Sequence, residues 1–502
     1  MALLWRRIKG SRAQSYEHLP LSENEKETPS TSSKYYKNGA PTFRTVIIAF
    51  VAFGSLIGIY GLTRSSATSV ANKSCDTIDD GYRCSPETTH FWGQYSLWFS
   101  VPSEISVQSP PECHVTFASV LSRHGGRDPT SNKAIAYGAL VGYIQNSTTT
   151  FPDEFAFLKD YQYTLGADQL TDAGRQEMVN SGAHFYRRYA GFLEKKTPFV
   201  RSSGQDRVVE SAEKWLMGFA QEGKRDETGK IDVRIPEEKG QNNTLSHEIC
   251  TAFEEGPLDK VGDSAQAIWV SKFVPLIQQR VNAKLGITLT PTEIIYLMDM
   301  CPFDTLSSPM AAVSEFCHLF TEAEWHQYDY YETLGKYYGY GNGNPLGPTQ
   351  GVGYVNELIA RLTEKPVDDH TNTNSTLDSD PATFPLDRKA YADFSHDNDM
   401  SAIFAALGLY NSTKPLSNST IEDTVQTNGF SAAWTVPFAA RMYVEKLQCK
   451  GDKEESVRII MNDRVMPLEF CGGDQYGRCA LSKFVESQSF ARSGGHWDQC
   501  FP

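Results

Sequence analysis

The stretch that decides the fold is HVTFASVLSRHGGRDP, residues 114–129. Its first half is mostly apolar, β-branched or aromatic, a pattern typical of a buried strand at residues 114–121. SRHGGRDPTSNK follows directly, and its glycines and proline predict a loop. Because ligands of open α/β sheets bind beyond the carboxyl ends of the strands, this loop is a predicted functional site.

Two later segments repeat the same order of strand, loop and helix. Residues 199–201 read as a strand end, followed by SSGQDR and a helix from about Val208. Residues 390–394 are strand-like, and 395–398 lead into a helix whose apolar face holds Met400, Ile403, Phe404 and Leu407. Another helix is predicted over 170–193. Strands that alternate with helices predict an α/β fold.

The loop after the first strand carries side chains suited to phosphoryl transfer. Arg123 and Arg127 can make forked, charge-assisted contacts with phosphate oxygens, and Gly125 allows close approach of the backbone. His124 can attack phosphorus only while its attacking nitrogen is unprotonated, a state that neighbouring arginines favour. The alternative is an exposed basic loop with an incidental histidine, but the RHGxRxP arrangement after an apolar strand favours the phosphate site.

The two later loops supply the remaining groups. Asp397 is suited to protonate a departing alkoxide and His396 to donate to phosphate, although Asp397 or Asn398 could instead simply cap the following helix. Arg201 is predicted to add a third cation to the phosphate cradle; the alternative is an arginine in a surface salt bridge.

The distribution of charge and the missing motifs exclude several classes. The formal net charge is −14, of which the first 44 residues carry +4 and the remaining 458 carry −18. Such an acidic body argues against nucleic acid as a partner. The sequence contains no GxxxxGK[ST], GxSxG, HExxH or CxxC motif. It therefore gives no support for a nucleotide-binding P-loop protein, a serine hydrolase or a zinc protein.

The N-terminal region predicts a membrane anchor. Residues 1–44 read as a disordered cytoplasmic tail, 45–63 (TVIIAFVAFGSLIGIYGLT) as a transmembrane signal anchor, 64–74 as a stalk and 75–502 as one ectodomain. A buried helix or a signal peptide is the alternative for 45–63, and secretion after cleavage the alternative to a single-pass type II protein. All ten cysteines and all six glycosylation sequons follow this segment, which indicates a lumenal or extracellular body; the sequons are at Asn72, Asn146, Asn242, Asn374, Asn411 and Asn418.

The chain resembles the fungal-type phytases of the histidine acid phosphatase family. RHGxRxP and HD are the family signatures, and the likeness extends through CDTIDDGYRCSP, LMDMCPFDT, KYYGYGNGNPLGP, YADFSHDN and ARSGGHWDQCF. The resemblance implies a large α/β domain with a smaller, mainly helical domain inserted between the two motifs. It also implies a monomeric ectodomain that acts on inositol phosphates and needs neither metal nor cofactor.

The resemblance further implies a role for individual residues. His124 would be the nucleophile, Asp397 the proton donor, and Arg123, Arg127, Arg201 and His396 the ligands of the scissile phosphate. The pocket would be lined by Gln94, Tyr95, Lys133 and Asn398. The implied disulfides are Cys75–Cys84, Cys113–Cys449, Cys250–Cys500, Cys301–Cys317 and Cys471–Cys479.

The chain departs from the family pattern at several positions. Asp128 stands where these enzymes often have Tyr, and Gly126 where Ala is common, so a carboxylate beside Arg127 is expected to weaken polyanion binding or shift the pH optimum. His326 and Gln327 stand where lysines are frequent, which predicts a less basic rim. A broad-specificity acid phosphatase therefore remains the alternative within the class. A non-catalytic, membrane-tethered binding ectodomain is the alternative outside it.

Overall fold

The computed structural model describes residues 75–193 and 196–502. Its centre is an 8-stranded mixed sheet with the strand order β10-β8-β7-β3-β6-β4-β5, in which β9 pairs with β8. The strands are β3 (Cys113–Arg123), β4 (Phe199–Ser203), β5 (Val233–Ile235), β6 (Ala390–Ser395), β7 (Arg441–Cys449), β8 (Ser456–Met461), β9 (Arg464–Val465) and β10 (Arg478–Ala480). The three strands predicted from sequence are therefore confirmed as β3, β4 and β6, each slightly longer than expected.

The direction of the strands brings three loops to one edge of the sheet. β3, β6, β4 and β5 run parallel, whereas β7, β8 and β10 pair antiparallel. On β3, Arg123 lies opposite Ser395, and on β4, Ser202 lies opposite Phe394. Since parallel strands end at the same edge, the loops after β3, β4 and β6 leave the sheet side by side.

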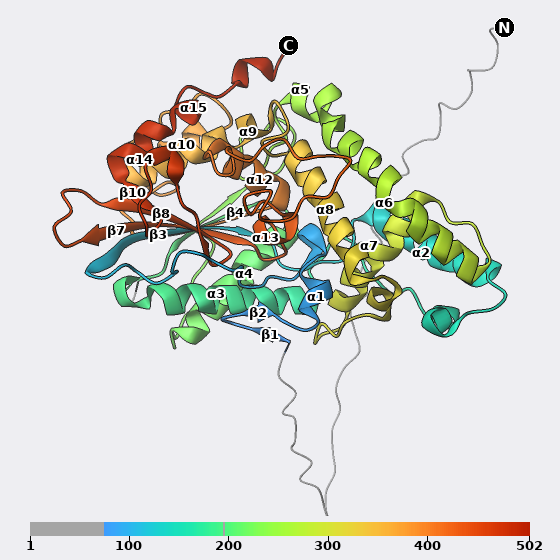
Figure 1. Ribbon diagram of the computed structural model, residues 1–502. Helices are drawn as coiled ribbons and strands as arrows, with labels where there is room; N and C mark the ends of the chain where they lie inside the picture. The colour runs from blue at the N-terminus through green and yellow to red at the C-terminus, as the bar shows by residue number, and fades with distance from the viewer. Residues whose placement is uncertain (1–74, 194–195) are drawn as a thin grey trace, which may run out of the picture. The chain divides into compact units, whose positions relative to one another are not determined.

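Helices cover both faces of the sheet (Figure 1). On one face lie α3 (Asp172–Leu193) and α4 (Asp206–Glu222), which correspond to the two helices predicted there. On the other lie α9 (Gly347–Gln350), α10 (Val352–Thr363), α12 (Asp397–Ala406), α14 (Leu481–Ser487) and α15 (Ser489–Arg492). Trp215 of α4 packs edge-on against Phe394 of β6, with ring centroids 5.7 Å apart. The predicted α/β architecture is confirmed.

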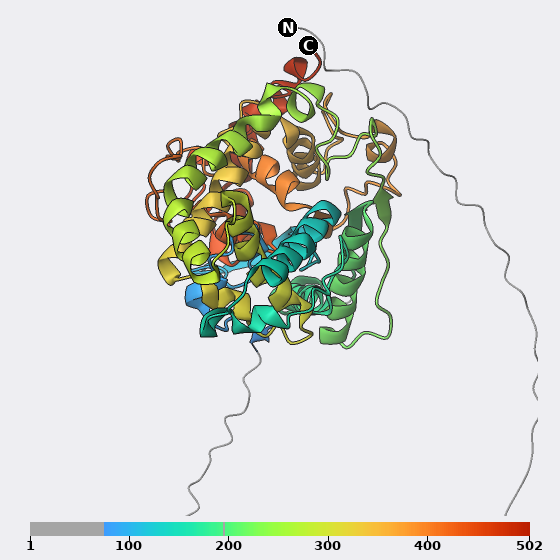
Figure 2. The ribbon, with the colours of Figure 1, turned by 90° about the vertical axis from the view of Figure 1, so that its right-hand side faces the viewer.

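A group of longer helices gathers beside one end of the sheet, and Figure 2 looks onto it. They are α2 (Ser131–Ser147), α6 (Val261–Leu285), α7 (Pro291–Ser307) and α8 (Glu322–Gly339), and all lie between β3 and β6 in the chain. Thr290 and Thr321 start α7 and α8 with reciprocal capping boxes, which fix where these helices begin. This group is the smaller, mainly helical part expected from the resemblance.

The remaining elements are short. They comprise β1 (Asp76–Thr77), β2 (Gly81–Tyr82), α1 (Pro86–Thr89), η1 (Gly93–Tyr95), η2 (Asp153–Lys159), α5 (Thr251–Glu254), η3 (Pro257–Lys260), η4 (Glu315–Leu319), α11 (Ser375–Asp378), α13 (Ala432–Thr435), η5 (Glu469–Cys471) and η6 (Trp497–Gln499). Disulfides tie several of these segments to the body: Cys75–Cys84, Cys113–Cys449, Cys250–Cys500, Cys301–Cys317 and Cys471–Cys479. These are the pairs that the family resemblance implied.

The prediction of a single-pass membrane protein is contradicted. In the part of the chain that the structure describes, residues 75–193 and 196–502, no helix is both long and apolar enough to cross a bilayer. α6 has the length, at 25 residues, but carries Asp263, Lys272, Arg280 and Lys284. The predicted tail (1–44), signal anchor (45–63) and stalk (64–74) lie outside the described residues. A lipid bilayer is accordingly not supported as a partner.

Candidate active site

The loops after β3, β4 and β6 meet at a cavity of about 580 Å³ between the sheet edge and the helical group. It is lined by both signature motifs and by residues of α6 and α8, including Gln94, Tyr95, His124, Arg127, Lys133, Arg207, Glu237, Glu332, Lys336, His396, Asp397 and Asn398. The structure thus brings together nearly all of the residues selected from the sequence. The exceptions are Arg123, which lies directly behind the lining, and Arg201.

His124 is held in the tautomer that a nucleophile needs. Its side chain is buried, and Nδ1 lies 2.8 Å from the carbonyl oxygen of Gly125. A carbonyl only accepts hydrogen bonds, so Nδ1 carries the proton and Nε2 keeps its lone pair. Burial, reinforced by the positive charges of Arg123 and Arg207, holds the pKa of His124 well below its usual range. The imidazole therefore stays neutral in acid.

The loop that carries His124 is pressed against α3. Gly125 donates its N–H to the hydroxyl of Ser211 on α4 at 3.1 Å. A Cβ at Gly125 would overlap the carbonyl oxygen of Gly174 on α3. A side chain at position 125 would therefore push the loop away from α3. The requirement for glycine here is steric, and it fixes the backbone on which His124 is mounted.

Arg123 and Arg127 keep donors available for a ligand. Arg123 is fully buried and bonds the carbonyl oxygens of Gln94 and Val436 through Nη1; its Nε has no hydrogen-bond partner among the described residues, and its Nη2 lies 3.3 Å from Oδ2 of Asp397. Arg127 donates through Nη1 to the Asp128 carbonyl at 2.7 Å, and its Nε is likewise unpartnered there. Unpaired buried donors are costly, so two guanidinium groups with spare N–H bonds indicate an anion site.

The third arginine of the cradle is Arg207, and the prediction of Arg201 was wrong. Arg201 is 2% exposed inside the sheet, where it binds Asp393 at 2.8 Å and Glu357 at 2.6 Å. Its side chain is satisfied by those carboxylates and does not line the cavity. Arg207 stands after the strand end, lines the cavity and has an unpartnered Nε among the described residues. Burial and the charge of Arg127 lower the pKa of Arg207 to about 10.

Asp397 lies between two cations. Lys336 donates to its Oδ2 at 2.6 Å, and Nη2 of Arg123 is 3.3 Å from the same oxygen. Burial opposes ionisation, but these two charges hold the pKa of Asp397 well below its usual range. Lys336 also donates to Oδ1 of Asn398 at 2.7 Å. Sequence reasoning missed this lysine because it lies on α8, remote in sequence from both motifs.

His396 has a partner that the sequence did not reveal. Its Nε2 lies 3.0 Å from Oε1 of Glu237, so Nε2 carries the proton and donates it to the carboxylate. Burial would raise the pKa of Glu237, but this bond and the nearby imidazole lower it to about 2. Glu237 thus sets the orientation of the His396 ring. The ring lies edge-on to His124, with centroids 5.5 Å apart.

The predicted pocket residues lie on the opposite wall of the cavity, where they are held by hydrogen bonds to buried acidic side chains. Lys133 donates to Tyr95 at 3.2 Å and to Asp299 at 2.9 Å, and Gln94 donates to Glu332 at 2.7 Å. These acidic partners partly offset the positive charge of the cavity. The cavity is therefore mixed in charge, with its cations concentrated around His124.

Two departures from the family pattern lie away from the cavity. The carboxylate of Asp128 accepts from the Gly166 N–H at 3.1 Å and does not line the cavity, so the expected direct weakening of polyanion binding has no structural basis. His326 stacks on Phe91 with ring centroids 3.8 Å apart, and neither His326 nor Gln327 reaches the cavity. The residues of α8 that line the cavity are Tyr331, Glu332, Gly335, Lys336 and Gly339.

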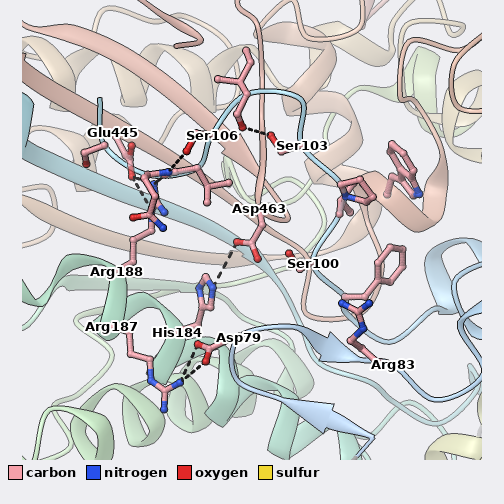
Figure 3. Close-up of a pocket in the computed structure, with 18 of the residues that line it drawn as sticks. Asp79, Arg83, Ser100, Ser103, Ser106, His184, Arg187, Arg188, Glu445 and Asp463 are labelled. Carbon is pink, nitrogen blue, oxygen red and sulfur yellow. Dashed lines mark hydrogen bonds and ion pairs between the residues drawn. The ribbon is translucent and has the colours of Figure 1, made fainter. Parts of the chain in front are cut away.

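A larger cavity, of about 1020 Å³, lies between α3, β7 and the segment 99–109 (Figure 3). Several of its charged side chains are paired with one another, among them Arg187 with Asp79 at 2.9 Å and Arg188 with Glu445 at 2.8 Å. Neither signature motif contributes to it. Size alone therefore does not identify the functional site, whereas the guanidinium Nε groups around His124 that have no hydrogen-bond partner among the described residues do.

The comparisons with known proteins agree with this geometry. Residues 114–462 match the model of the histidine phosphatase superfamily (branch 2). Phytase A of Aspergillus fumigatus is 52% identical over 453 residues, covering 88% of this chain and 97% of that protein. Phytase A of Aspergillus awamori is 54% identical over 439 residues, covering 85% and 93%.

Solved structures show the same fold. The crystal structure of the phytase from D. castellii has a TM-score of 0.69 and 22% identity, covering 82% of this chain and 87% of that chain. At this identity the likeness concerns the fold. The match of the family model over most of the chain, together with relatives that are more than half identical, shows that the chain belongs to branch 2 of the histidine phosphatase superfamily.

Proposed function

We propose that this protein is an acid phosphomonoesterase of the phytase type, which removes phosphate groups stepwise from myo-inositol hexakisphosphate through a phosphohistidine intermediate. The observation that carries the proposal is the neutral imidazole of His124 beside the buried Nε donors of Arg123, Arg127 and Arg207, which have no hydrogen-bond partner among the described residues. The relatives named Phytase A support the choice of substrate. Such a constellation binds a phosphate dianion and presents a nucleophile to it.

The chemical steps balance with the groups present. The lone pair on Nε2 of His124 forms a bond to phosphorus while the bond between phosphorus and the leaving oxygen breaks, and Asp397 gives its proton to that oxygen. Water then attacks the phosphohistidine, the P–N bond breaks, and Asp397 takes back a proton. Inorganic phosphate leaves and His124 is restored. Arg123, Arg127 and Arg207 bind the equatorial oxygens, whose charge they stabilise.

Asp397 must gain a proton before it can act as an acid. Arg123 and Lys336 keep it ionised while no anion offsets their charge. A bound phosphate dianion neutralises these cations, so the pKa of Asp397 rises towards the acid range. Proton uptake is in this way coupled to substrate binding, and low pH supplies the proton.

A broad-specificity acid phosphatase is the second candidate, and the mixed charge of the cavity favours it. Glu237 and Glu254 line the same cavity as Lys133 and Lys336. Carboxylates near the bound substrate weaken the attraction of a highly charged polyanion more than that of a monophosphate. The ratio of kcat/KM for inositol hexakisphosphate to that for p-nitrophenyl phosphate separates the two candidates.

The decisive experiment is a substrate panel at acid pH combined with trapping of the phosphoenzyme. The wild-type protein should release phosphate from inositol hexakisphosphate and yield an acid-labile phosphohistidine after a rapid quench. His124→Ala should abolish both signals while retaining the wild-type circular dichroism spectrum. Failure of the wild type to release phosphate from either ester would refute the proposed function.

A further inference from the structure

Glu177 of α3 joins two segments that build the active site. Its side chain is 4% exposed. Oε2 accepts the N–H of Gly126 at 2.9 Å, and Oε1 accepts the N–H of Trp98, also at 2.9 Å. Gly126 stands between the predicted nucleophile and Arg127, whereas Trp98 follows the segment that carries the pocket residues Gln94 and Tyr95. One buried carboxyl group therefore spans the nucleophile loop and the pocket wall.

The backbone N–H and C=O groups of Gly126 are both hydrogen-bonded, to Glu177 of α3 and to Thr171, the residue that precedes this helix. Besides the bond to Glu177, the carbonyl oxygen of Gly126 accepts the N–H of Thr171 at 3.1 Å. A Cβ at position 126 would lie only 3.1 Å from Oε2 of Glu177, and a Cβ at Gly174 would overlap the Gly126 carbonyl. This close approach leaves the peptide a single orientation. Since His124 and Arg127 flank this peptide, its orientation determines where both side chains point.

The carboxyl group suits this task in either protonation state. Burial, with a contribution from the charge of Asp76, raises the pKa of Glu177 to about 8, although the two backbone bonds and Arg123 act in the opposite direction. Each oxygen of a neutral carboxyl still has a lone pair for an N–H donor. The nitrogen of a glutamine side chain has none, so glutamine, although equal in shape, must leave one of the two N–H groups without an acceptor.

We propose that Glu177 is a positioning residue for phosphoryl transfer, which aligns the nucleophile loop with the pocket wall by holding the Gly126 and Trp98 peptides together. The proposal rests on the proposed function of the site. Glu177 does not line the cavity, so it acts on the reaction through the backbone that carries His124. Its loss should affect the chemical step more than the affinity for substrate.

The test compares Glu177→Gln with a matched control, Glu445→Gln. Glu445 is also a fully buried carboxylate, but it binds Arg188 and Arg458 on the side of the sheet shown in Figure 3. Both variants exchange the carboxyl group of a buried glutamate for an amide. All assays use the full chain and p-nitrophenyl phosphate, well below the Tm of each protein.

We expect Glu177→Gln to lower kcat about tenfold or more, with the rate of phosphohistidine formation falling by the same factor and KM changing less than about threefold. Glu445→Gln should keep kcat within about twofold of wild type, even where its Tm falls further. A wild-type kcat in Glu177→Gln, or an equal loss in both variants, would overturn the proposal. Absence of a phosphoenzyme in the wild type would instead refute the proposed function itself.

Glu177→Asp keeps the test informative should the glutamine variant not fold. Aspartate retains two acceptor oxygens but withdraws them by about 1.5 Å, the length of one carbon–carbon bond. We expect a fall in kcat smaller than that of Glu177→Gln, accompanied by faster hydrogen exchange in peptides covering residues 94–99 and 124–130. Unchanged kcat with faster exchange would show that holding these peptides does not matter for turnover.

Discussion

Arg201 of β4 lies opposite Asp393 of β6 in the sheet register, and its Nε donates to Oδ1 of that carboxylate at 2.8 Å. Arg361 donates to the other oxygen of Asp393 at 2.5 Å. Arg201, Asp393 and Arg361 therefore form a buried structural charge cluster behind the edge of the sheet that carries the site. Arg207, beyond the end of the same strand, is the arginine that lines the cavity. One short stretch of sequence thus contains two arginines with different tasks.

Because Arg201 is buried in the sheet and Arg207 lines the cavity, we expect substitution of Arg201 to lower stability and substitution of Arg207 to lower activity. Arg201→Ala leaves Asp393 and Glu357 buried without one of their cations, so we expect the free energy of unfolding to fall by about 3–5 kcal/mol. Arg207→Ala should leave the Tm nearly unchanged but lower kcat/KM by at least about tenfold. Urea titrations and steady-state kinetics measure the two effects. A stable but inactive Arg201→Ala protein would contradict the assignment.

Removing the cation beside Asp397 should shift the pH profile. Lys336→Met removes a positive charge 2.6 Å from Oδ2, so the pKa of Asp397 rises and the acid stays protonated to a higher pH. We expect the alkaline limb of kcat to move towards neutral pH. The measurement is kcat for p-nitrophenyl phosphate across pH. An unchanged limb would show that Asp397 does not set it.

Asp397→Asn should discriminate between leaving groups. An amide cannot protonate the departing oxygen, which matters most for alcohols of high pKa. We expect a loss of about 10²- to 10⁴-fold with glycerol phosphate or inositol hexakisphosphate, and a much smaller loss with p-nitrophenyl phosphate. Comparison of kcat for these esters provides the measurement. Equal losses on all of them would argue against a role as proton donor.

Thermal stability should be highest in mildly acidic solution. Burial is the main cause that raises the pKa of Glu177 and Asp378 to about 8 and that of Asp329 and Glu332 to about 7. Above the ordinary carboxyl range the folded state therefore binds more protons than the unfolded state, and stability falls as the pH rises towards 8.

The carboxylates with depressed pKa limit stability on the acid side. Charges of arginines overcome burial and lower the pKa of Asp393 to about 2, and His396 does the same for Glu237. Their contribution is complete above the ordinary carboxyl pKa and is lost as the pH falls towards 2. Tm measured by calorimetry should thus peak near about pH 4–5. A Tm that rises steadily from pH 5 to 8 would contradict this account.

The sequons differ in how well the structure exposes them. Asn146 and Asn411 are exposed, and Nδ2 of Asn146 donates only within its own helix, to the Gly142 carbonyl at 2.8 Å; Asn242 is half-buried, and its Nδ2 donates to the carbonyl of the distant Thr373 at 2.7 Å. Asn72 lies outside the described residues. In a glycosylating host we expect Asn146→Gln and Asn411→Gln each to lower the mass by one glycan. Asn242→Gln should leave the mass of the glycoprotein unchanged, and gel mobility before and after deglycosylation tests both outcomes.

The sequence by itself determined the three strands that carry the site, the helices that follow them and the core of the chemistry. The apolar run at 114–121 and the turn residues after it set a strand followed by a loop, because these preferences act over a few neighbouring residues. The motifs after β3 and β6 named His124, Arg123, Arg127 and Asp397 correctly as neighbours in one site. Their proximity follows from a simple rule, since parallel strands end at a common edge.

Only the tertiary structure decided which groups surround these residues. The sequence pattern did not distinguish an arginine inside the strand from one beyond its end, so Arg201 was selected and Arg207 was missed. Glu237, Lys336 and Glu177 come from segments far apart in the chain, and no local signal marks them. Their roles arise from burial: a carboxyl or ammonium group gains a specific function once folding removes water and leaves it only a few fixed partners.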